Sequence, residues 1–423
     1  MKVDLLISNI GQLVTCASSL PKRGRAMLDV GLIENGAIAV SDGKILAVGK
    51  SSDLEGMYEV TDVVDAAGKV VCPGFVDPHT HIIYAGDRLN EFELKIQGAD
   101  YLEILANGGG IISTVKHTRE ASVAELVEQS TKRLDKMLAC GTTTAEIKTG
   151  YGLNAETELK MLAVIAELDT THVIDIVPTF LGAHAIPPES KDNPERYVNL
   201  ICDTMLSSAW KWFVGSAFYR RGPFFCDVFC EKGAFTLAQS KKILETAKSL
   251  GFKLKAHVDE FTNFGGSRLA IEMGAVSIDH LDAISDEEIK LLAASNTVGI
   301  VTPTVNFNFG SSHFADARKL IDAGCAVALS TDYNPGSAPC PSQPMAMAIA
   351  CRYQKLLPAE AVNAVTINAA FAVGMGAKAG SIEVGKQADI LIFDTADHRE
   401  IAYEFGGIRP SSIFMKGKLV QVK

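Results

Sequence analysis

The sequence predicts an α/β protein in which a central (β/α)8 barrel is joined to a small β-sandwich built by both chain ends. Three observations lead to this fold class. Apolar strand candidates alternate with amphipathic helices through the middle of the chain, which is typical of parallel α/β folds. Eight such strands can be counted, as a barrel of this kind requires. Short strands separated by turns recur at both ends, and neither end alone could bury enough apolar surface.

The two ends are predicted to be β-rich and to meet in one small domain. The run at 1–7 is a strand candidate, and apolar segments flank a Gly-containing turn at 41–44, which indicates a hairpin. Short apolar strand candidates occur again at 389–394 and 412–420. The expected organisation is therefore a sandwich and a barrel with these bounds: 1–72 for the N-terminal part of the sandwich, 73–372 for the barrel and 373–423 for the C-terminal part of the sandwich.

The barrel strands are predicted in the central region, with helices between most of them. The strand candidates are 75–81, 143–149, 172–180, 225–230, 252–257, 275–281, 297–301 and 325–331. Helical periodicity is clear over Leu237–Leu250 and Ser285–Ala294. An open doubly wound sheet is the alternative, but it leaves unexplained the His and Asp residues at several strand ends.

Composition limits the classes of function. Of the 423 residues, 47% are apolar and 21% are charged, as in ordinary globular proteins. The net charge of -10 argues against a sequence-independent nucleic-acid binder. No uncharged apolar run is long enough to span a membrane, and the N-terminus does not resemble a signal peptide. The nine cysteines are scattered and mostly lie in apolar surroundings, so we expect reduced thiols and a cytoplasmic location.

Two histidines end the first barrel strand. His79 and His81 stand at i and i+2 in an apolar extended run, so both imidazoles point to the same side of the strand. This spacing allows them to converge on one metal ion. The pair alone is weak support, because such histidines are often merely packed.

Other strand ends of the predicted barrel supply similar residues. His257 ends strand five and Glu260 follows it, His280 ends strand six, and Asp332 ends strand eight. Catalytic groups in such barrels gather at the carboxyl ends of the strands. One histidine at a strand end is commonly a satisfied core residue. Four strand ends that supply His or Asp at one rim are much harder to explain by packing.

The chemistry of these side chains predicts a mononuclear hydrolytic site. Three imidazoles and one carboxylate suit Zn or Fe, and these ligands are His79, His81, His257 and Asp332. A metal of this kind lowers the pKa of a bound water. Glu260 is close enough to be a general base and proton shuttle, and His280 could orient the attacking hydroxide or polarise the scissile carbonyl.

Several stretches resemble the amidohydrolase superfamily, which implies a distorted (β/α)8 TIM barrel with a β-sandwich from both chain ends. The first of them, Pro73 to His81, is followed by the later histidines and by Ser330-Thr331-Asp332. Four more stretches are similar to those superfamily members that hydrolyse the cyclic amide of 4-imidazolone-5-propanoate in histidine degradation. They are Glu91 to Ile111, Gly141 to Leu153, Phe180 to Pro187 and Ser330 to Pro339, and the resemblance covers nearly the whole chain.

This resemblance implies a site and a reaction. The family's metal ligands match the four residues named above, with one Zn or Fe ion per chain. Its substrate contacts match Arg88, Tyr151, His184, Glu260, Asn334, Gly336 and Ser337. Hydroxide on the metal would attack the ring carbonyl while Glu260 passes a proton to the departing nitrogen, and Glu260, His280 and Asp332 would be catalytic. The product would be N-formimidoyl-L-glutamate. The expected partner is a small-molecule substrate, with no nucleic acid or membrane, and a homodimer is common in the family.

The implied contacts make physical sense for an anionic substrate. Arg88 lies seven residues past His81 and can offer a bidentate guanidinium to the propanoate. Tyr151 and His184 follow glycine-containing ends of strands two and three, where they can face the ring. Residues 334–337 follow Asp332 directly and so border the same pocket.

Three competing hypotheses remain at this stage. A guanine-type deaminase would share the ligand set but should lack an Arg and Tyr pair for a propanoate. A hydantoinase-like enzyme would need a bridging lysine from strand four, which has none, whereas Lys148 lies on strand two. A non-catalytic scaffold with this fold would usually have lost ligands. The sequence does not distinguish Zn from Fe.

Overall fold

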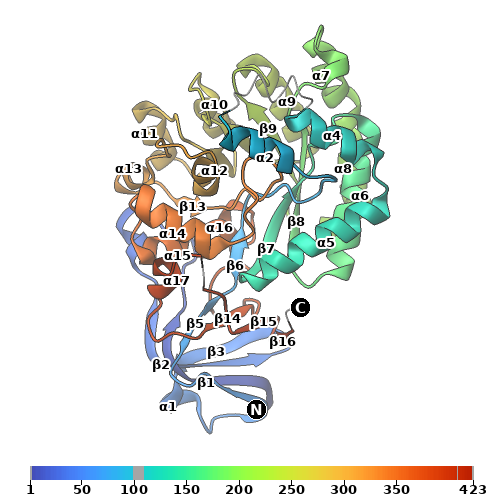
Figure 1. Cartoon of the computed structure of the whole chain (residues 1–423). Helices are drawn as coiled ribbons and strands as arrows, with labels where there is room; N and C mark the ends of the chain where they lie inside the picture. The colour runs from blue at the N-terminus through green and yellow to red at the C-terminus, as the bar shows by residue number, and fades with distance from the viewer. Residues whose placement is uncertain (1, 99–108, 407, 422–423) are drawn as a thin grey trace.

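The computed structural model of the chain describes residues 2–98, 109–406 and 408–421. Part of the stretch from Glu91 to Ile111 therefore lies outside the described residues. Figure 1 shows two bodies, a ring of helices around a strand barrel and a lower sheet in which the two ends of the chain meet.

The barrel consists of eight parallel strands in sequential order, and the predicted fold class is confirmed. The strands are β6 (Phe75–Asp77), β7 (Thr142–Lys148), β8 (Asp175–Ala183), β9 (Phe225–Cys230), β10 (Lys253–Val258), β11 (Ser277–His280), β12 (Val298–Val301) and β13 (Val327–Leu329). Every predicted strand is present, although the first and last are shorter than expected. Their interior positions are almost all buried, as in sheets covered on both faces.

The first and last strands meet through a seam of a few backbone and side-chain hydrogen bonds. β6 and β13 share no continuous ladder, but Thr80 and Tyr333 form an isolated parallel bridge, and the His81 amide donates to the Tyr333 carbonyl at 2.9 Å. The Ser330 hydroxyl donates to Asp77 Oδ1 at 2.5 Å. The barrel is therefore nearly closed, and its seam carries His79, His81 and Asp332.

Helices surround the barrel and follow most strands (Figure 1). They are α2 (Leu89–Ile96), α4 (Ile111–Glu120), α5 (Val123–Ala139), α6 (Ala155–Thr171), α7 (Pro194–Leu200), α8 (Leu206–Gly215), α9 (Leu237–Leu250), α10 (Gly266–Met273), α11 (Asp286–Ala294), α12 (Pro303–Asn308), α13 (Ala317–Asp322), α14 (Gln343–Tyr353), α15 (Pro358–Ala364) and α16 (Ile367–Ala372). The predicted bounds of α9 are confirmed. α11 begins one residue after Ser285, whose side chain caps it in a capping box with Glu288. In the described ranges no helix combines the length and apolarity needed to cross a bilayer.

The chain ends build one separate sheet of eight strands. Its members are β1 (Lys2–Val14), β2 (Leu32–Ser41), β3 (Lys44–Lys50), β4 (Glu59–Asp65), β5 (Val70–Pro73), β14 (Ile390–Phe393), β15 (Ser412–Met415) and β16 (Lys418–Val420), with the short helices α1 (Ser51–Leu54) and α17 (Glu400–Tyr403) nearby in the sequence. The path runs β16-β15-β14-β5-β1-β2-β3, and β4 pairs with β1. The hairpin predicted around 41–44 is confirmed, with positive φ at Asp42 and Gly43.

This end sheet folds back on itself rather than forming two unconnected layers. The amide of Ile45 in β3 donates to the Lys386 carbonyl at 2.9 Å, just before β14. Side chains from both ends of the chain share its core, among them Leu13, Ile38, Ile390 and Phe414. Hydrogen bonds and apolar burial therefore join residues that lie more than three hundred positions apart in the sequence.

Candidate active site

The two histidines of the first strand lie just beyond it. β6 ends at Asp77, so His79 and His81 belong to an extended segment after the strand, whereas the sequence predicted a strand to residue 81. The bridge at Thr80 and the donation of its hydroxyl to the Glu146 carbonyl at 2.6 Å keep this segment extended. Both imidazoles therefore point to one side, and their Nε2 atoms are 3.2 Å apart.

The four predicted metal ligands converge at the rim. His257 Nε2 is 3.4 Å from His81 Nε2, and Asp332 Oδ1 is 3.6 Å and 3.5 Å from the Nε2 atoms of His79 and His81. Two donors bound to one ion at about 2.1 Å, at an angle of about 90–120°, lie roughly 3.0–3.6 Å apart. The spacing of these donors therefore fits a single metal ion.

Two of the imidazoles have a carboxylate next to Nδ1, the ring nitrogen that does not face the other donors. His79 Nδ1 is hydrogen-bonded to Asp279 Oδ2 at 2.6 Å, whereas His257 Nδ1 lies 3.0 Å from Asp227 Oδ2 at an angle outside hydrogen-bond geometry. A carboxylate next to Nδ1 favours the imidazole tautomer that carries its proton on Nδ1, and this tautomer leaves the Nε2 lone pair free. Both free lone pairs face the space between the four donors.

The electrostatics of the donors also suit a cation. Burial, followed by the neighbouring Lys148 ammonium, lowers the pKa of His79, and burial followed by His184 lowers the pKa of His81. Neutral imidazole is the form that binds a metal. Burial raises the pKa of Asp332 because it outweighs the hydrogen bond from Asn334 and the charge of the Lys148 ammonium, so this carboxylate lacks enough compensating positive charge. A metal ion would supply that charge.

Glu260 lies in a turn after β10, beside the donors. The amides of Phe261 and Thr262 donate to Glu231 Oε2 at 3.0 and 3.1 Å and so fix this turn. Burial, and next the charge of Asp332, raise the pKa of Glu260 well above its usual range. A carboxyl group with a raised pKa can both take up and release a proton near neutral pH.

His280 ends β11 and faces Glu260. Its Nδ1 lies 3.1 Å from the Thr302 hydroxyl. Its buried Nε2 has no hydrogen-bond partner among the described residues and lies 3.8 Å from Glu260 Oε2. Its φ of 84° is unusual for a residue with a bulky side chain. Backbone strain of this kind is often found at functional sites.

The rings of two predicted substrate contacts, Tyr151 and His184, pack beside the imidazole of His81. The His184 ring stacks on His81 with centroids 4.9 Å apart, and Tyr151 lies 5.4 Å from His184. His184 Nδ1 is 3.0 Å from the Gly150 carbonyl. One His184 nitrogen also falls within 4.8 Å of donor atoms of His81 and His257, a proximity that the sequence did not predict.

Arg88 lies against Gly336, in the loop after Asp332, and is already paired. Its guanidinium forms an ion pair with Glu91, and Nη1 donates to the Thr114 hydroxyl at 3.2 Å. A Cβ atom at Gly336 would approach Arg88 Nη1 to 3.2 Å, so the two residues are in close contact. Glu91 was not predicted, although the i, i+3 spacing to Arg88 at the start of a helix was a usable signal.

The loop after Asp332 is organised by one amide. Asn334 Nδ2 donates to the Asp332 carbonyl and to the Ser337 hydroxyl, both at 2.7 Å. Its Oδ1 accepts from the amides of Gly336 and Ser337 at 2.8 Å each. Asn334, Gly336 and Ser337 therefore lie together beside Asp332, and the Asn334 amide mainly holds the loop.

A set of buried charges beneath the rim was missed by the sequence reasoning. Its members, all with fully buried side chains, are Glu146, Lys148, Asp227, Lys255 and Asp279. Charged residues in the interior of a predicted strand are rare and were a usable signal. Burial lowers the pKa of Lys148, but Asp227 and Glu146 outweigh it, so the pKa is raised overall.

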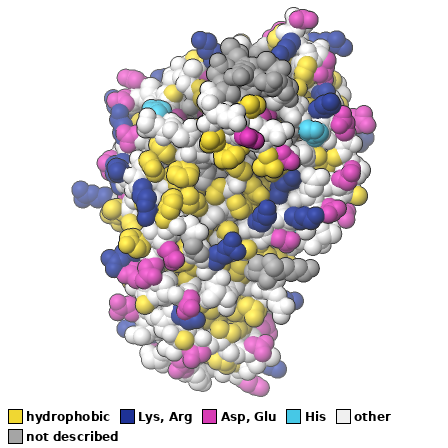
Figure 2. Space-filling model, viewed as in Figure 1, with side chains coloured by type: hydrophobic (Ala, Val, Ile, Leu, Met, Phe, Trp, Pro, Cys, Tyr) yellow, Lys and Arg dark blue, Asp and Glu magenta, His cyan; other side chains and the backbone are white. Residues whose placement is uncertain are grey.

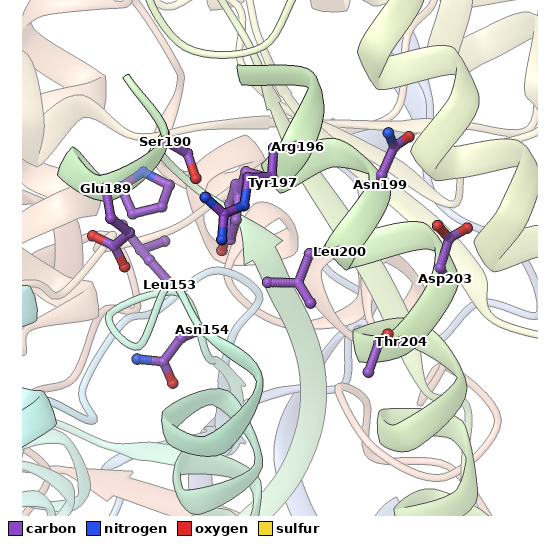
Figure 3. Close-up of a pocket in the computed structure, with 11 residues that line it drawn as sticks. Leu153, Asn154, Glu189, Ser190, Arg196, Tyr197, Asn199, Leu200, Asp203 and Thr204 are labelled. Carbon is purple, nitrogen blue, oxygen red and sulfur yellow. The ribbon is translucent and has the colours of Figure 1, made fainter. Parts of the chain in front are cut away.

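A separate surface pocket of about 340 Å³ lies near the ends of β7 and β8. Figure 3 shows it between α7 and the turn at Pro188–Ser190, with Leu153, Glu189, Arg196 and Tyr197 among its lining residues. None of the predicted site residues lines it.

The fold and the donor set together define an amidohydrolase. Two family models, both described as the amidohydrolase family, match residues 62–100 and 228–420. The solved structure of an adenosine deaminase from Xanthomonas campestris, which contains bound zinc, matches with a TM-score of 0.74 and 20% identity, covering 100% of this chain and 93% of that one. At this identity the likeness shows the fold alone.

More similar relatives identify the family within that class. The imidazolonepropionase of Chloroflexus aggregans is 51% identical over 419 residues, which are 99% of this chain and 98% of that protein. The imidazolonepropionase of Herpetosiphon aurantiacus is 51% identical over 418 residues, which are 99% and 97% of the two chains. The chain belongs to the imidazolonepropionase family.

Proposed function

We propose that this enzyme hydrolyses the cyclic amide of 4-imidazolone-5-propanoate to N-formimidoyl-L-glutamate in histidine catabolism. The observation that carries this proposal is full-length identity of 51% to proteins named imidazolonepropionase. The alternative of a guanine-type deaminase rests on fold likeness to solved deaminases at 16–20% identity. Arg88, an arginine whose guanidinium lies against Gly336 in the loop after Asp332, supports an anionic substrate that would take the place of Glu91 as its partner.

His79, His81, His257 and Asp332 are the proposed ligands of one metal ion, either Zn or Fe. Their convergence to within 3.2–3.6 Å supports this assignment for the donor pairs that the structure brings together. When bound, the metal would polarise the ring carbonyl and lower the pKa of a water molecule.

The protein's own groups would carry the proton. Glu260 accepts a proton from the attacking water and delivers it to the ring nitrogen as the C–N bond breaks, so water is added across that bond. His280 Nε2, buried 3.8 Å from Glu260, orients the nucleophile or donates to the developing oxyanion. Arg88 binds the propanoate, while Tyr151 and His184 border the ring.

The proposal is tested by following the loss of imidazolonepropionate absorbance with purified protein, with the metal content of the same sample measured in parallel. Turnover with N-formimidoyl-L-glutamate as product is expected. Full metal occupancy without turnover would instead favour another amidohydrolase reaction.

The raised pKa of Glu260 predicts the pH dependence of the reaction. Glu260 must be ionised to act as a base, so kcat/KM should fall as the pH drops through its pKa. We expect the acidic limb of kcat/KM at a pH above about 4.3, the ordinary pKa of Glu, because burial raises the pKa of Glu260. Metal content should stay constant through the limb, which separates titration of Glu260 from loss of the ion. A limb at the ordinary value would argue against Glu260.

Replacing Arg88 should mainly weaken substrate binding. In Arg88→Ala we expect KM to rise at least about tenfold with kcat little changed, because a bidentate contact to a carboxylate is lost. Arg268→Ala is a matched control, since this arginine lies on α10 with its side chain 48% exposed. Steady-state kinetics of both variants test the assignment, and an unchanged KM in Arg88→Ala would remove this residue from the pocket.

The proposal also includes the domain bounds, the cellular location and the oligomeric state. The proposed domain bounds, 72/73 and 372/373, lie close to the ends of β5 at Pro73 and of α16 at Ala372. A cytoplasmic location is in keeping with nine free cysteines.

A homodimer is supported by an exposed aromatic cluster in which Phe307 lies 6.5 Å from Tyr353 and 6.3 Å from Phe405. Figure 2 shows hydrophobic side chains gathered in this part of the surface, and the molar mass in solution tests this state.

A further inference from the structure

Five charged side chains form a connected cluster inside the barrel, directly behind two of the metal-facing histidines. Lys148 Nζ is 2.7 Å from both Glu146 Oε1 and Asp227 Oδ2, and 3.7 Å from Asp279 Oδ2. Lys255 Nζ lies 3.2 Å from Glu146 Oε1 and 3.8 Å from Asp279 Oδ2. Each of these side chains is completely buried.

Two of the carboxylates connect this cluster to the donors. Asp227 Oδ2 accepts from Lys148 and lies 3.0 Å from His257 Nδ1. Asp279 Oδ2 lies 2.6 Å from His79 Nδ1, while its Oδ1 accepts from the Ser277 hydroxyl at 2.7 Å. The same two carboxylates therefore touch the lysines on one side and the imidazoles on the other.

We propose that Asp227 and Asp279 are positioning residues that hold His257 and His79, respectively, for metal binding. We further propose that the Lys148 ammonium, which contacts both carboxylates, makes their effects on metal binding depend on each other. The inference rests on the metal centre of the proposed function.

Packing alone does not account for this cluster. Taking charges out of water is costly, and buried ion pairs can often be replaced by apolar residues without loss of stability. Two cations here face three carboxylates, so one surplus negative charge lies next to the two imidazoles. A carboxylate at Nδ1 orients an imidazole and increases the basicity of its other nitrogen. Lys148 keeps the two carboxylates close together without mutual repulsion.

The test measures metal binding in the absence of substrate. Metal-free protein is titrated with Zn²⁺ against a chromophoric chelator, and Co²⁺-loaded protein is compared by visible absorption. We expect Asp227→Asn and Asp279→Asn each to bind Zn²⁺ about 10–100-fold more weakly, with an altered Co²⁺ spectrum, because each change removes the charge and keeps the shape. Failure of the proposed substrate turnover would leave this measurement unaffected.

Glu360→Gln is the matched control. Glu360 is a buried carboxylate that pairs with Arg318 and caps α15, and it contacts none of the metal-facing groups. A purely structural role predicts that all three variants lower the unfolding temperature of the metal-free protein and leave Zn²⁺ affinity unchanged. That result would overturn the proposal for Asp227 and Asp279.

The coupling through Lys148 has its own test. Lys148→Met should weaken Zn²⁺ binding at least about tenfold, because both carboxylates lose a shared cation. If this variant does not fold, the double variant Asp227→Asn/Asp279→Asn decides the question. Its loss of affinity should differ at least about threefold from the product of the two single losses. Simple multiplication of the single effects would show that the two carboxylates act independently.

Discussion

Glu260→Gln should lower kcat by about 10²–10⁴ while the protein keeps its metal. The amide has the shape of the carboxyl group but cannot take a proton from water. Glu260 is not one of the four converging donors, so metal content per chain should equal that of the native enzyme. Because burial disfavours the Glu260 charge, the unfolding temperature should be unchanged or slightly higher. Single-turnover kinetics, metal analysis and thermal melting measure these three quantities.

Glu272→Gln is the control for this experiment. Glu272 lies on α10, in the same βα unit of the barrel, with its side chain 61% exposed. It should show native kcat, metal content and unfolding temperature. Near-native kcat in Glu260→Gln would show that another group carries the proton.

Removal of His81 should cost both the metal and the activity. His81 Nε2 lies 3.2, 3.4 and 3.5 Å from the donor atoms of His79, His257 and Asp332, so it is the central member of the set. In His81→Ala we expect Zn²⁺ affinity to fall at least about 100-fold, more than for loss of a supporting carboxylate. Activity per chain should fall with metal content, and excess Zn²⁺ in the assay should restore part of it.

His398→Ala is the matched control for this variant. His398 lies before α17, where its Nδ1 is 2.8 Å from Gln12 Oε1. Elemental analysis of the purified protein should find native metal content in His398→Ala and a deficit in His81→Ala. A full complement of metal in His81→Ala would mean that the four donors do not form the centre as proposed.

Most of the candidate site could be predicted because its signals are local. A histidine or aspartate at the end of an apolar strand can be seen in the sequence, and the barrel geometry brings such ends to one rim. His79, His81, His257 and Asp332 were found in this way, and the structure places all four together. The bounds of β9 and α9 were predicted for the same reason, since their patterns are complete within each segment.

What could not be predicted depends on contacts between distant segments. The early end of β6 follows from the seam with β13, where Asp77 accepts from Ser330 and Thr331. The pairing of Arg88 with Glu91 and the folding of the 334–337 loop around Asn334 depend on side-chain orientation. The charges behind the donors are separated by up to 133 residues along the chain, between Glu146 and Asp279. Each is unremarkable until the strands are placed side by side.

The end sheet has a consequence for how the protein is made. Its core joins Leu13 and Ile38 to Ile390 and Phe414, so the first strands cannot complete their packing until the last ones have been synthesised. At about 5–20 residues per second, ribosomes need on the order of tens of seconds to make the intervening chain. During that time β1 to β5 can pack on one another, but the part of their core that the C-terminal strands complete stays exposed. The N-terminal strands therefore wait with an incomplete core for the last part of the chain, and a truncation that removes β14 and β15 should leave apolar surface of the end sheet exposed to water.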